Sequence, residues 1–182
     1  LLFFRNETGF GGNNGFTDFK RILNVPITTP SMRVLLCVLS GLVLIAFVGS
    51  VFSPYYARAR RRGVSDPENH CALNVALYGE GGHRWSMTER GKRWISRGET
   101  RFTIGPSSMR WEEGALVIDI DEVTVPLPSR LRGQVRLEPS AICAHEVRLD
   151  PKGEHVWRPV APFSRIEASF EKPALRWSGI GY

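Results

Sequence analysis

A histidine and a tryptophan two positions apart are the residues of this sequence best suited to chemistry. His155 and Trp157 lie in the run HVWRP, and the alternation of side chains along a strand places both on one face. An imidazole beside an indole can bind a cation or orient a water molecule. The pair also occurs as an ordinary contact between a strand and a loop, so its spacing leaves both interpretations open. Further on, Trp177 and Tyr182 flank the run SGIG, whose accessible backbone could admit a ligand.

Two carboxylates form a second candidate site. Asp119 and Asp121, in VIDIDEV, share a strand face opposite Ile118 and Ile120. On such a strand the two side chains lie about 6–7 Å apart, which is within the range of a glycosidase pair. A buried aliphatic face opposite a solvated or hydrogen-bonded face gives the same pattern, and we favour that interpretation.

The histidines and cysteines do not form a metal-binding motif. Cys143 and His145 are one close pair, but a structural zinc site needs two pairs of ligands, which His70, Cys71 and His83 do not complete. The sequence also lacks a Gly-x-Ser-x-Gly elbow, a phosphate-binding glycine loop and a dinucleotide fingerprint. We therefore expect neither a metal nor another cofactor. The odd number of widely spaced cysteines favours a reducing compartment over a disulfide framework.

The chain that must position these residues has 182 residues, and 42% of them are apolar. This length is enough for one domain or one and a half. This composition excludes a disordered, collagenous or coiled-coil chain. The net charge is +6, and much of it comes from Arg58, Arg60, Arg61 and Arg62. Because aromatic residues are not interleaved with this cluster, it fits an anionic membrane surface or a solvated loop better than nucleic acid.

An apolar run precedes the arginine cluster. Residues 34–52, VLLCVLSGLVLIAFVGSVF, carry no charge over nineteen positions, which satisfies the length of a membrane-spanning helix. The arginines after it would then place the C-terminal part in the cytoplasm. The second half of the run is rich in β-branched and aromatic residues and ends at Pro54, which is typical of a buried strand.

Beyond Gly63 the pattern is that of strands throughout. Short runs of alternating or apolar residues are bounded by Gly or Pro at the spacing of an antiparallel sandwich or barrel. These runs are CALNVALYG, HRWSMTE, RFTIG, ALVIDIDEVTVPL, GQVRLEP, HVWRPV, RIEASFE and ALRWSG, the first two forming a hairpin. No amphipathic helix of three turns follows, so the sequence predicts an all-β fold and the apolar run is better interpreted as one of its strands.

Several long motifs then resemble one family. In order along the chain they are LIAFVGSVFSPYYARARRRG, DPENHCALNVALYG, MTERG, IDIDEVTVPLP, LRGQVRL, HVWRPVAP and LRWSGIGY. They closely resemble the carotenoid 1,2-hydratases, or hydroxyneurosporene synthases, of phototrophic bacteria, over about residues 42–182. The resemblance implies a lipocalin- or calycin-like antiparallel barrel or sandwich, truncated here at its C-terminus. Residues 1–41 do not match and are expected to be a poorly ordered or non-native leader.

The resemblance also implies a reaction. These enzymes hydrate the terminal double bond between carbon 1 and carbon 2 of acyclic carotenoids such as lycopene and neurosporene, without a cofactor. Protonation at carbon 2 gives a tertiary carbocation at carbon 1, which water captures. An alkene is a very weak base, so the acid must be a carboxyl kept protonated by an apolar site.

The family's H-x-W element corresponds to His155 and Trp157, and the Tyr of its Y-x-D element corresponds to Tyr182. The resemblance implies that Trp157 and Tyr182 flank the cation and that His155 orients water or tunes the acid. The Asp of the Y-x-D element, the expected proton donor, would fall two positions beyond Tyr182. We therefore expect a C-terminally truncated and inactive fragment.

Two other functions stay open at this point. A lipocalin-like carrier would hold a long apolar ligand without chemistry, and a single-pass membrane protein would place a small β domain in the cytoplasm. A hydratase would take an acyclic carotenoid and water, with no nucleic acid. We expect it in the cytoplasm, peripherally associated with the inner or intracytoplasmic membrane, with residues 58–62 as a candidate contact for anionic lipid.

Overall fold

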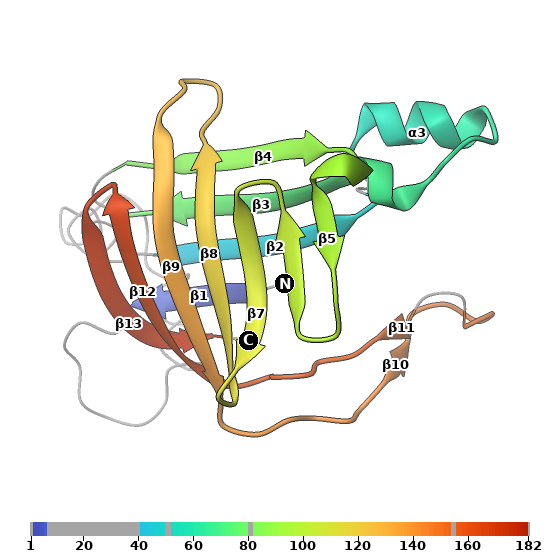
Figure 1. The fold of residues 1–182 in the computed structure, drawn as a ribbon. Helices are drawn as coiled ribbons and strands as arrows, with labels where there is room; N and C mark the ends of the chain where they lie inside the picture. Colours follow the sequence, from blue (N-terminus) through green and yellow to red (C-terminus); the bar gives the residue numbers. More distant parts are fainter. Residues whose placement is uncertain (1, 7–40, 50–51, 80–81, 154–155, 182) are drawn as a thin grey trace, which may run out of the picture.

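Antiparallel strands account for most of the computed structural model, which describes residues 2–6, 41–49, 52–79, 82–153 and 156–181 (Figure 1). The strands are β1 (Leu2–Asn6), β2 (Gly41–Val48), β3 (Cys71–Tyr78), β4 (Arg84–Arg90), β5 (Ile95–Arg97), β6 (Arg101–Ile104), β7 (Ser107–Glu112), β8 (Ala115–Val123), β9 (Arg130–Pro139), β10 (Val147–Arg148), β11 (Val156–Trp157), β12 (Ser164–Lys172) and β13 (Leu175–Gly181). The helical elements are α3 (Pro54–Arg61) and the 3₁₀ turns η1 (Pro67–His70) and η2 (Lys92–Trp94). The predicted all-β class is confirmed.

The strands form because apolar residues recur with a period of two. In β12, Ile166, Ala168 and Phe170 are buried, while the residues between them face outward. Strand β3 is different, since six of its eight residues are buried, as in a strand covered on both faces. Both patterns give each strand an apolar face for a shared core.

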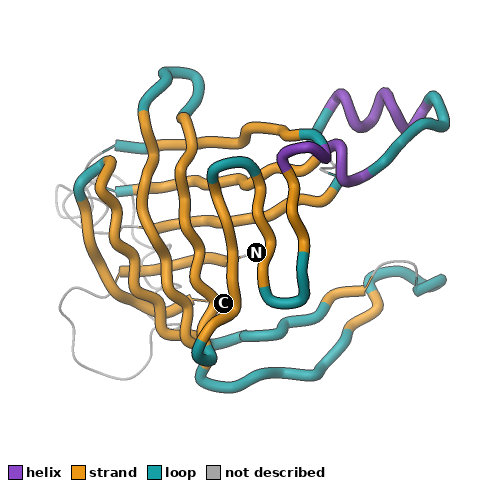
Figure 2. The backbone as a smooth tube through the Cα atoms, in the orientation of Figure 1, coloured by secondary structure: helices purple, strands orange, loops and turns teal. Residues whose placement is uncertain are grey.

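One eleven-stranded sheet contains all strands except β10 and β11, in the order β4-β3-β2-β1-β13-β12-β9-β8-β7-β6-β5. Its two parts cross each other as two layers, with β1 to β4 in one layer and the remaining strands in the other (Figures 1 and 2). The core lies between the layers, where Leu42, Leu44 and Leu73 of the first meet Ile118, Leu137 and other buried residues of the second. The fold is therefore sandwich-like.

The two end strands of the sheet, β4 and β5, do not pair with each other among the described residues. Of the two architectures that the sequence allowed, the described part is thus the sandwich and not a closed barrel. A backbone hydrogen bond bridges the open side, where Val125 donates its N–H to the carbonyl of Trp85 in β4 over 2.9 Å.

The apolar run contributes a strand to this sheet. Strand β2 pairs over its full length with β3, from Gly41 opposite Tyr78 to Val48 opposite Cys71. The prediction that the second half of the run is a strand is confirmed, and residues 34–40 lie outside the described residues. No helix in the described ranges is both long enough and apolar enough to span a membrane.

The first residues of the predicted leader also take part in the sheet. Strand β1 pairs with β2 through Leu2 and Phe3 and with β13 through Phe4, Arg5 and Asn6, so it joins the two layers. Residues 7–40 lie outside the described part of the chain. The boundary between a leader and a hydratase-like domain at residues 41 and 42 stays a prediction.

A short helix, α3, carries most of the arginine cluster. The sequence left open whether this segment is a solvated loop or a contact for an anionic membrane. Ser53 caps α3 by accepting the N–H of Tyr56 at its Oγ over 2.9 Å, and Pro54 occupies the first turn, where its missing N–H removes no hydrogen bond. Arg58, Arg60 and Arg61 fall in the last turn, where positive charge is favoured by the carbonyl end of the helix.

Candidate functional site

Trp157 lies on a small ribbon that branches from the sandwich. Strands β10 and β11 pair as a separate two-stranded sheet, with Val147 opposite Trp157 and Arg148 opposite Val156. Beside the ribbon, Arg158 forms an ion pair with Glu146 at 2.5 Å. Trp157 is 52% exposed, so its indole face is accessible to a ligand.

The ribbon belongs to an excursion between β9 and β12 that we call the arm, residues 140–153 and 156–163. At its root, Ser140 donates its N–H to the carbonyl of Phe163 over 3.0 Å, and the arm extends away from the two layers (Figure 2). Large apolar side chains are unusually exposed on it. They are Ile142, Leu149, Val156, Trp157, Val160 and Phe163, each more than 40% exposed. Exposed apolar side chains are therefore distributed along the arm that carries Trp157.

His155 and Tyr182, the other two predicted site residues, lie outside the described residues. Their described neighbours are informative. Val156 is on the ribbon, whereas Gly181 ends β13 and pairs with Ser164, the first residue after the arm. The end of β13 thus lies beside the root of the arm that carries Trp157.

The carboxylates Asp119 and Asp121 occupy the outer face of β8. Asp119 accepts hydrogen bonds from Arg110 and, over 2.8 Å, from Gln134. Asp121 accepts one from Arg130 over 2.5 Å, and this bond raises the pKa of the Arg130 guanidinium. Each carboxylate has its own arginine, so the hydrogen-bonded strand face is confirmed.

Sequence reasoning missed a buried charge in the core. Glu122 is 1% exposed; its Oε1 accepts from the Ser107 hydroxyl and its Oε2 from Arg90, both over 2.7 Å. The signal was present in VIDIDEV, because Ile118, Ile120 and Glu122 share one face by alternation. The ion pair joins β4 of one layer to β8 of the other, on the open side of the sandwich.

Gly105 makes room for this ion pair. Its φ is +61°, and a Cβ atom at this position would lie 2.3 Å from Nε of Arg90. A side chain would therefore displace the guanidinium that Glu122 holds.

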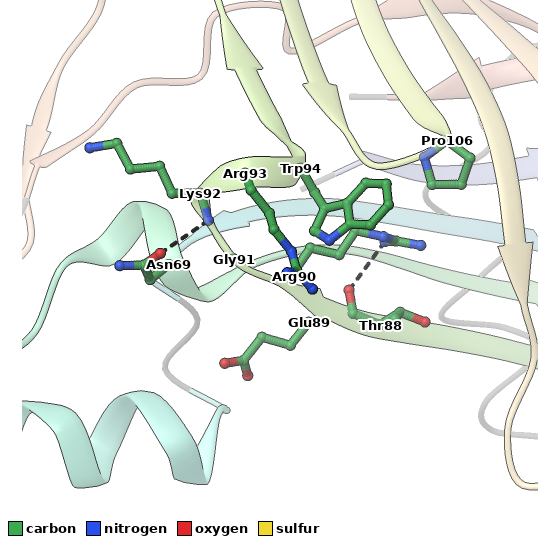
Figure 3. Close-up of a pocket in the computed structure, with 9 residues that line it drawn as sticks. All are labelled: Asn69, Thr88, Glu89, Arg90, Gly91, Lys92, Arg93, Trp94 and Pro106. Carbon is green, nitrogen blue, oxygen red and sulfur yellow. Dashed lines mark hydrogen bonds between the residues drawn. The ribbon is translucent and has the colours of Figure 1, made fainter.

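A cleft of about 660 Å³ opens next to Arg90 (Figure 3). Charged and polar residues line it, namely Lys92, Arg93, Asn69, Glu89 and Arg90, and Asn69 accepts the N–H of Lys92 over 3.1 Å. Trp94, Pro106, Thr88 and Gly91 complete the lining. None of these lining residues belongs to the arm.

The described cysteines and histidines are engaged locally. Cys71 is buried, and this burial raises the pKa of its thiol; Cys143 accepts the N–H of His145 at its Sγ over 3.4 Å. His70 lies 2.5 Å from Glu89. Across the described ranges, no three His, Cys, Asp or Glu side chains are grouped so that they could hold a metal ion.

Comparison with known proteins gives one consistent result. The family model for the carotenoid hydratase CrtC matches residues 44–182. The acyclic carotenoid 1,2-hydratase of Thiocapsa roseopersicina is 60% identical over 142 residues, which cover 78% of this chain and 35% of that protein. The enzyme of the same name from Rubrivivax gelatinosus is 54% identical over 144 residues, covering 78% and 36%. That of Cereibacter sphaeroides is 44% identical over 140 residues, covering 76% and 48%.

The chain thus spans about a third to a half of the length of these curated relatives. No solved structure matches it significantly. The matched segment includes β2 to β13 almost entirely, and with them the arm that carries Trp157.

Proposed function

Because the chain belongs to the carotenoid hydratase family, we propose that the protein to which it belongs is a hydro-lyase of carotenoid biosynthesis. It adds water across the terminal double bond between carbon 1 and carbon 2 of an acyclic carotenoid of the lycopene or neurosporene type. The observation that carries this proposal is the 60% identity over 142 residues to an acyclic carotenoid 1,2-hydratase. At this level of identity the matched residues share a fold.

The proposed reaction is an acid-catalysed hydration. A carboxylic acid transfers its proton to carbon 2, and the electron pair of the double bond forms the new C–H bond. The tertiary cation left at carbon 1 is captured by the oxygen of a water molecule, which then loses a proton to a base, so that one H and one OH are added in total. The scheme needs a protonated carboxyl in apolar surroundings, aromatic faces beside the cation and an acceptor that orients the water.

Trp157, Tyr182 and His155 are the residues we assign to these tasks. Trp157 and Tyr182 flank the cation, and His155 positions the water or tunes the acid. Two described features support the assignment. The indole of Trp157 is half exposed on the arm, and the pairing of Ser164 with Gly181 brings the end of β13 to the root of that arm.

The acid of this scheme is the Asp of the Y-x-D element, two positions after Tyr182 in the family pattern. We propose that a polypeptide of these 182 residues alone does not hydrate lycopene, whereas a version extended through that Asp does. Retention of lycopene without turnover by the extended protein would instead favour the carrier function.

The location follows from the substrate. An acyclic carotenoid dissolves in the bilayer and not in water, so we propose that the protein works in the cytoplasm in peripheral contact with the inner or intracytoplasmic membrane. This contact would let the polyene pass from the lipid to the site without crossing water.

A tryptophan replacement tests the assignment. In the extended protein we expect Trp157→Leu to lower the rate of lycopene hydration by about tenfold or more, because a cation over an indole face is stabilised by about 2 kcal/mol when desolvated. The matched control is Trp111→Leu, since Trp111 is 40% exposed but belongs to β7 of the sandwich and not to the arm. Equal rates for the two variants, measured by chromatography of the extracted carotenoids, would remove Trp157 from the site.

A further inference from the structure

The net positive charge of the chain is concentrated at α3. Four exposed arginines lie within five consecutive residues, in a segment without an acidic side chain. They are Arg58, Arg60, Arg61 and Arg62, which we call the arginine cluster. None of the ion pairs found among the described residues involves them, whereas arginines of the sandwich such as Arg110, Arg130 and Arg136 pair with carboxylates. The cluster therefore presents uncompensated charge to its surroundings.

Exposed apolar side chains flank the arginine cluster along the chain. Phe52, Tyr55 and Val64 are 70%, 72% and 73% exposed. Phe52 precedes the helix, Tyr55 lies in its first turn and Val64 follows its end, so that large apolar groups stand on both sides of the charges. Arginine and aromatic or aliphatic side chains together are the combination that binds the interface of a bilayer, where phosphates lie directly above the acyl chains.

The helix itself is weakly held by the rest of the fold. None of its residues is buried, and it projects away from the two layers (Figure 1). Its main contacts are the Ser53 cap and the ring of Tyr56, which lies 5.0 Å from that of His70. An eight-residue helix is too short to be stable in water by itself, so a second surface that covers its exposed side would stabilise it.

We propose that α3 with its flanking residues Phe52, Tyr55 and Val64 is a docking surface for a bilayer that contains anionic phospholipids. The arginine cluster contacts the lipid phosphates, and the three apolar side chains enter the boundary between headgroups and acyl chains. The need for such a surface rests on the proposed function, because a hydratase of a bilayer-soluble polyene must collect its substrate from the lipid. A nucleic acid would match the charge but gives no reason for Phe52 and Val64 to flank it.

Binding to vesicles without carotenoid tests this docking surface independently of the hydration reaction. We expect the chain to cosediment with phosphatidylcholine vesicles that contain phosphatidylglycerol, and to bind vesicles of phosphatidylcholine alone far more weakly. Replacing all four residues of the arginine cluster by glutamine lowers the partition coefficient by about a hundredfold or more, at about fivefold per basic residue. The matched control replaces four exposed strand arginines by glutamine and is expected to change binding by less than about fivefold. Its positions are Arg101, Arg132, Arg165 and Arg176.

A second variant keeps every charge. Phe52→Ser with Tyr55→Ser is expected to lower the partition coefficient by about tenfold or more, because the apolar area that enters the bilayer is lost. Leu127→Ser is its control, since Leu127 is 82% exposed on the loop after β8. Circular dichroism of each variant verifies that the sheet is retained.

Three results would overturn the proposal: equal losses in the cluster variant and its control, full binding by the Phe52 and Tyr55 variant, or binding to an oligonucleotide in place of vesicles. Hydration of lycopene in detergent micelles separates this proposal from the enzymatic one. If the extended cluster variant hydrates micellar lycopene but does not bind vesicles, both proposals stand. If vesicle binding follows the expected pattern and no variant hydrates lycopene, only the proposed function fails.

Discussion

Replacing Glu122 by alanine should remove a large part of the stability of the sandwich. The carboxylate is 1% exposed and holds Arg90 and Ser107 over 2.7 Å each. Without it, the Arg90 guanidinium, whose side chain is 13% exposed, stays in the core with no counter-charge. Removing one partner of a buried ion pair lowers the free energy of unfolding by about 3–5 kcal/mol. The free energy of unfolding of a whole domain is only about 5–15 kcal/mol.

Urea unfolding followed by tryptophan fluorescence measures this loss. With a slope of about 2 kcal/mol per molar urea, the expected loss lowers the midpoint by roughly 2 M. The control is Glu167→Ala, because Glu167 pairs with Arg165 at 3.0 Å on the outer face with both side chains more than half exposed. An exposed pair contributes at most about 1 kcal/mol.

A double replacement separates the charge from the packing. Arg90→Met with Glu122→Leu removes both charges and fills most of the volume, so we expect a stability within about 2 kcal/mol of the original chain. If Glu122→Ala lowers the midpoint no more than Glu167→Ala does, the ion pair does not join the two layers as we describe, and the reasoning is refuted.

Two further predictions concern local structure. Gly105→Ala should lower the free energy of unfolding, measured in urea, by about 3 kcal/mol, because its φ is +61° and the added Cβ displaces Arg90. Gly63→Ala, with a similar φ but open space around it, should lose only about 1 kcal/mol in the same urea unfolding experiment. Ser53→Ala should destabilise α3 by about 1 kcal/mol, because the helix loses its N-terminal cap. We expect faster hydrogen exchange at the amide of Tyr56 in this variant. Unchanged exchange would show that the cap does not stabilise the helix.

The strands could be predicted from the sequence because their signal is local. The alternation in Ser164–Lys172 and the apolar run of Cys71–Tyr78 each contain the information that makes a strand. Gly41–Val48 was ambiguous by composition alone and was assigned correctly once the rest of the chain was recognised as β. The strand Ser107–Glu112 was not predicted, because its polarity is mixed and its buried residues are small serines.

The pairing of strands that lie far apart in the sequence could not be predicted from local patterns. Nothing local in Leu2–Asn6 indicates that this segment pairs with Leu175–Gly181, more than 160 residues away, since such pairing depends on the packing of the whole sheet. The core ion pair was hidden for a related reason. Alternation placed Glu122 inside, but its partner Arg90 lies 32 residues away on another layer. The candidate site rests on the family resemblance of the H-x-W and Y-x-D elements and stays a prediction. What the structure adds is the exposure of Trp157 and the approach of β13 to the root of the arm.

The most direct test of the proposed function follows the atoms of water into the product. The chain extended through the Y-x-D element is incubated with lycopene once in H₂¹⁸O and once in D₂O, and the carotenoids are analysed by mass spectrometry. We predict one ¹⁸O at carbon 1 and one deuterium at carbon 2 for each hydrated end, because both added groups come from water. A hydroxylated product whose oxygen derives from O₂, or unchanged lycopene that stays bound to the folded protein, would contradict the account.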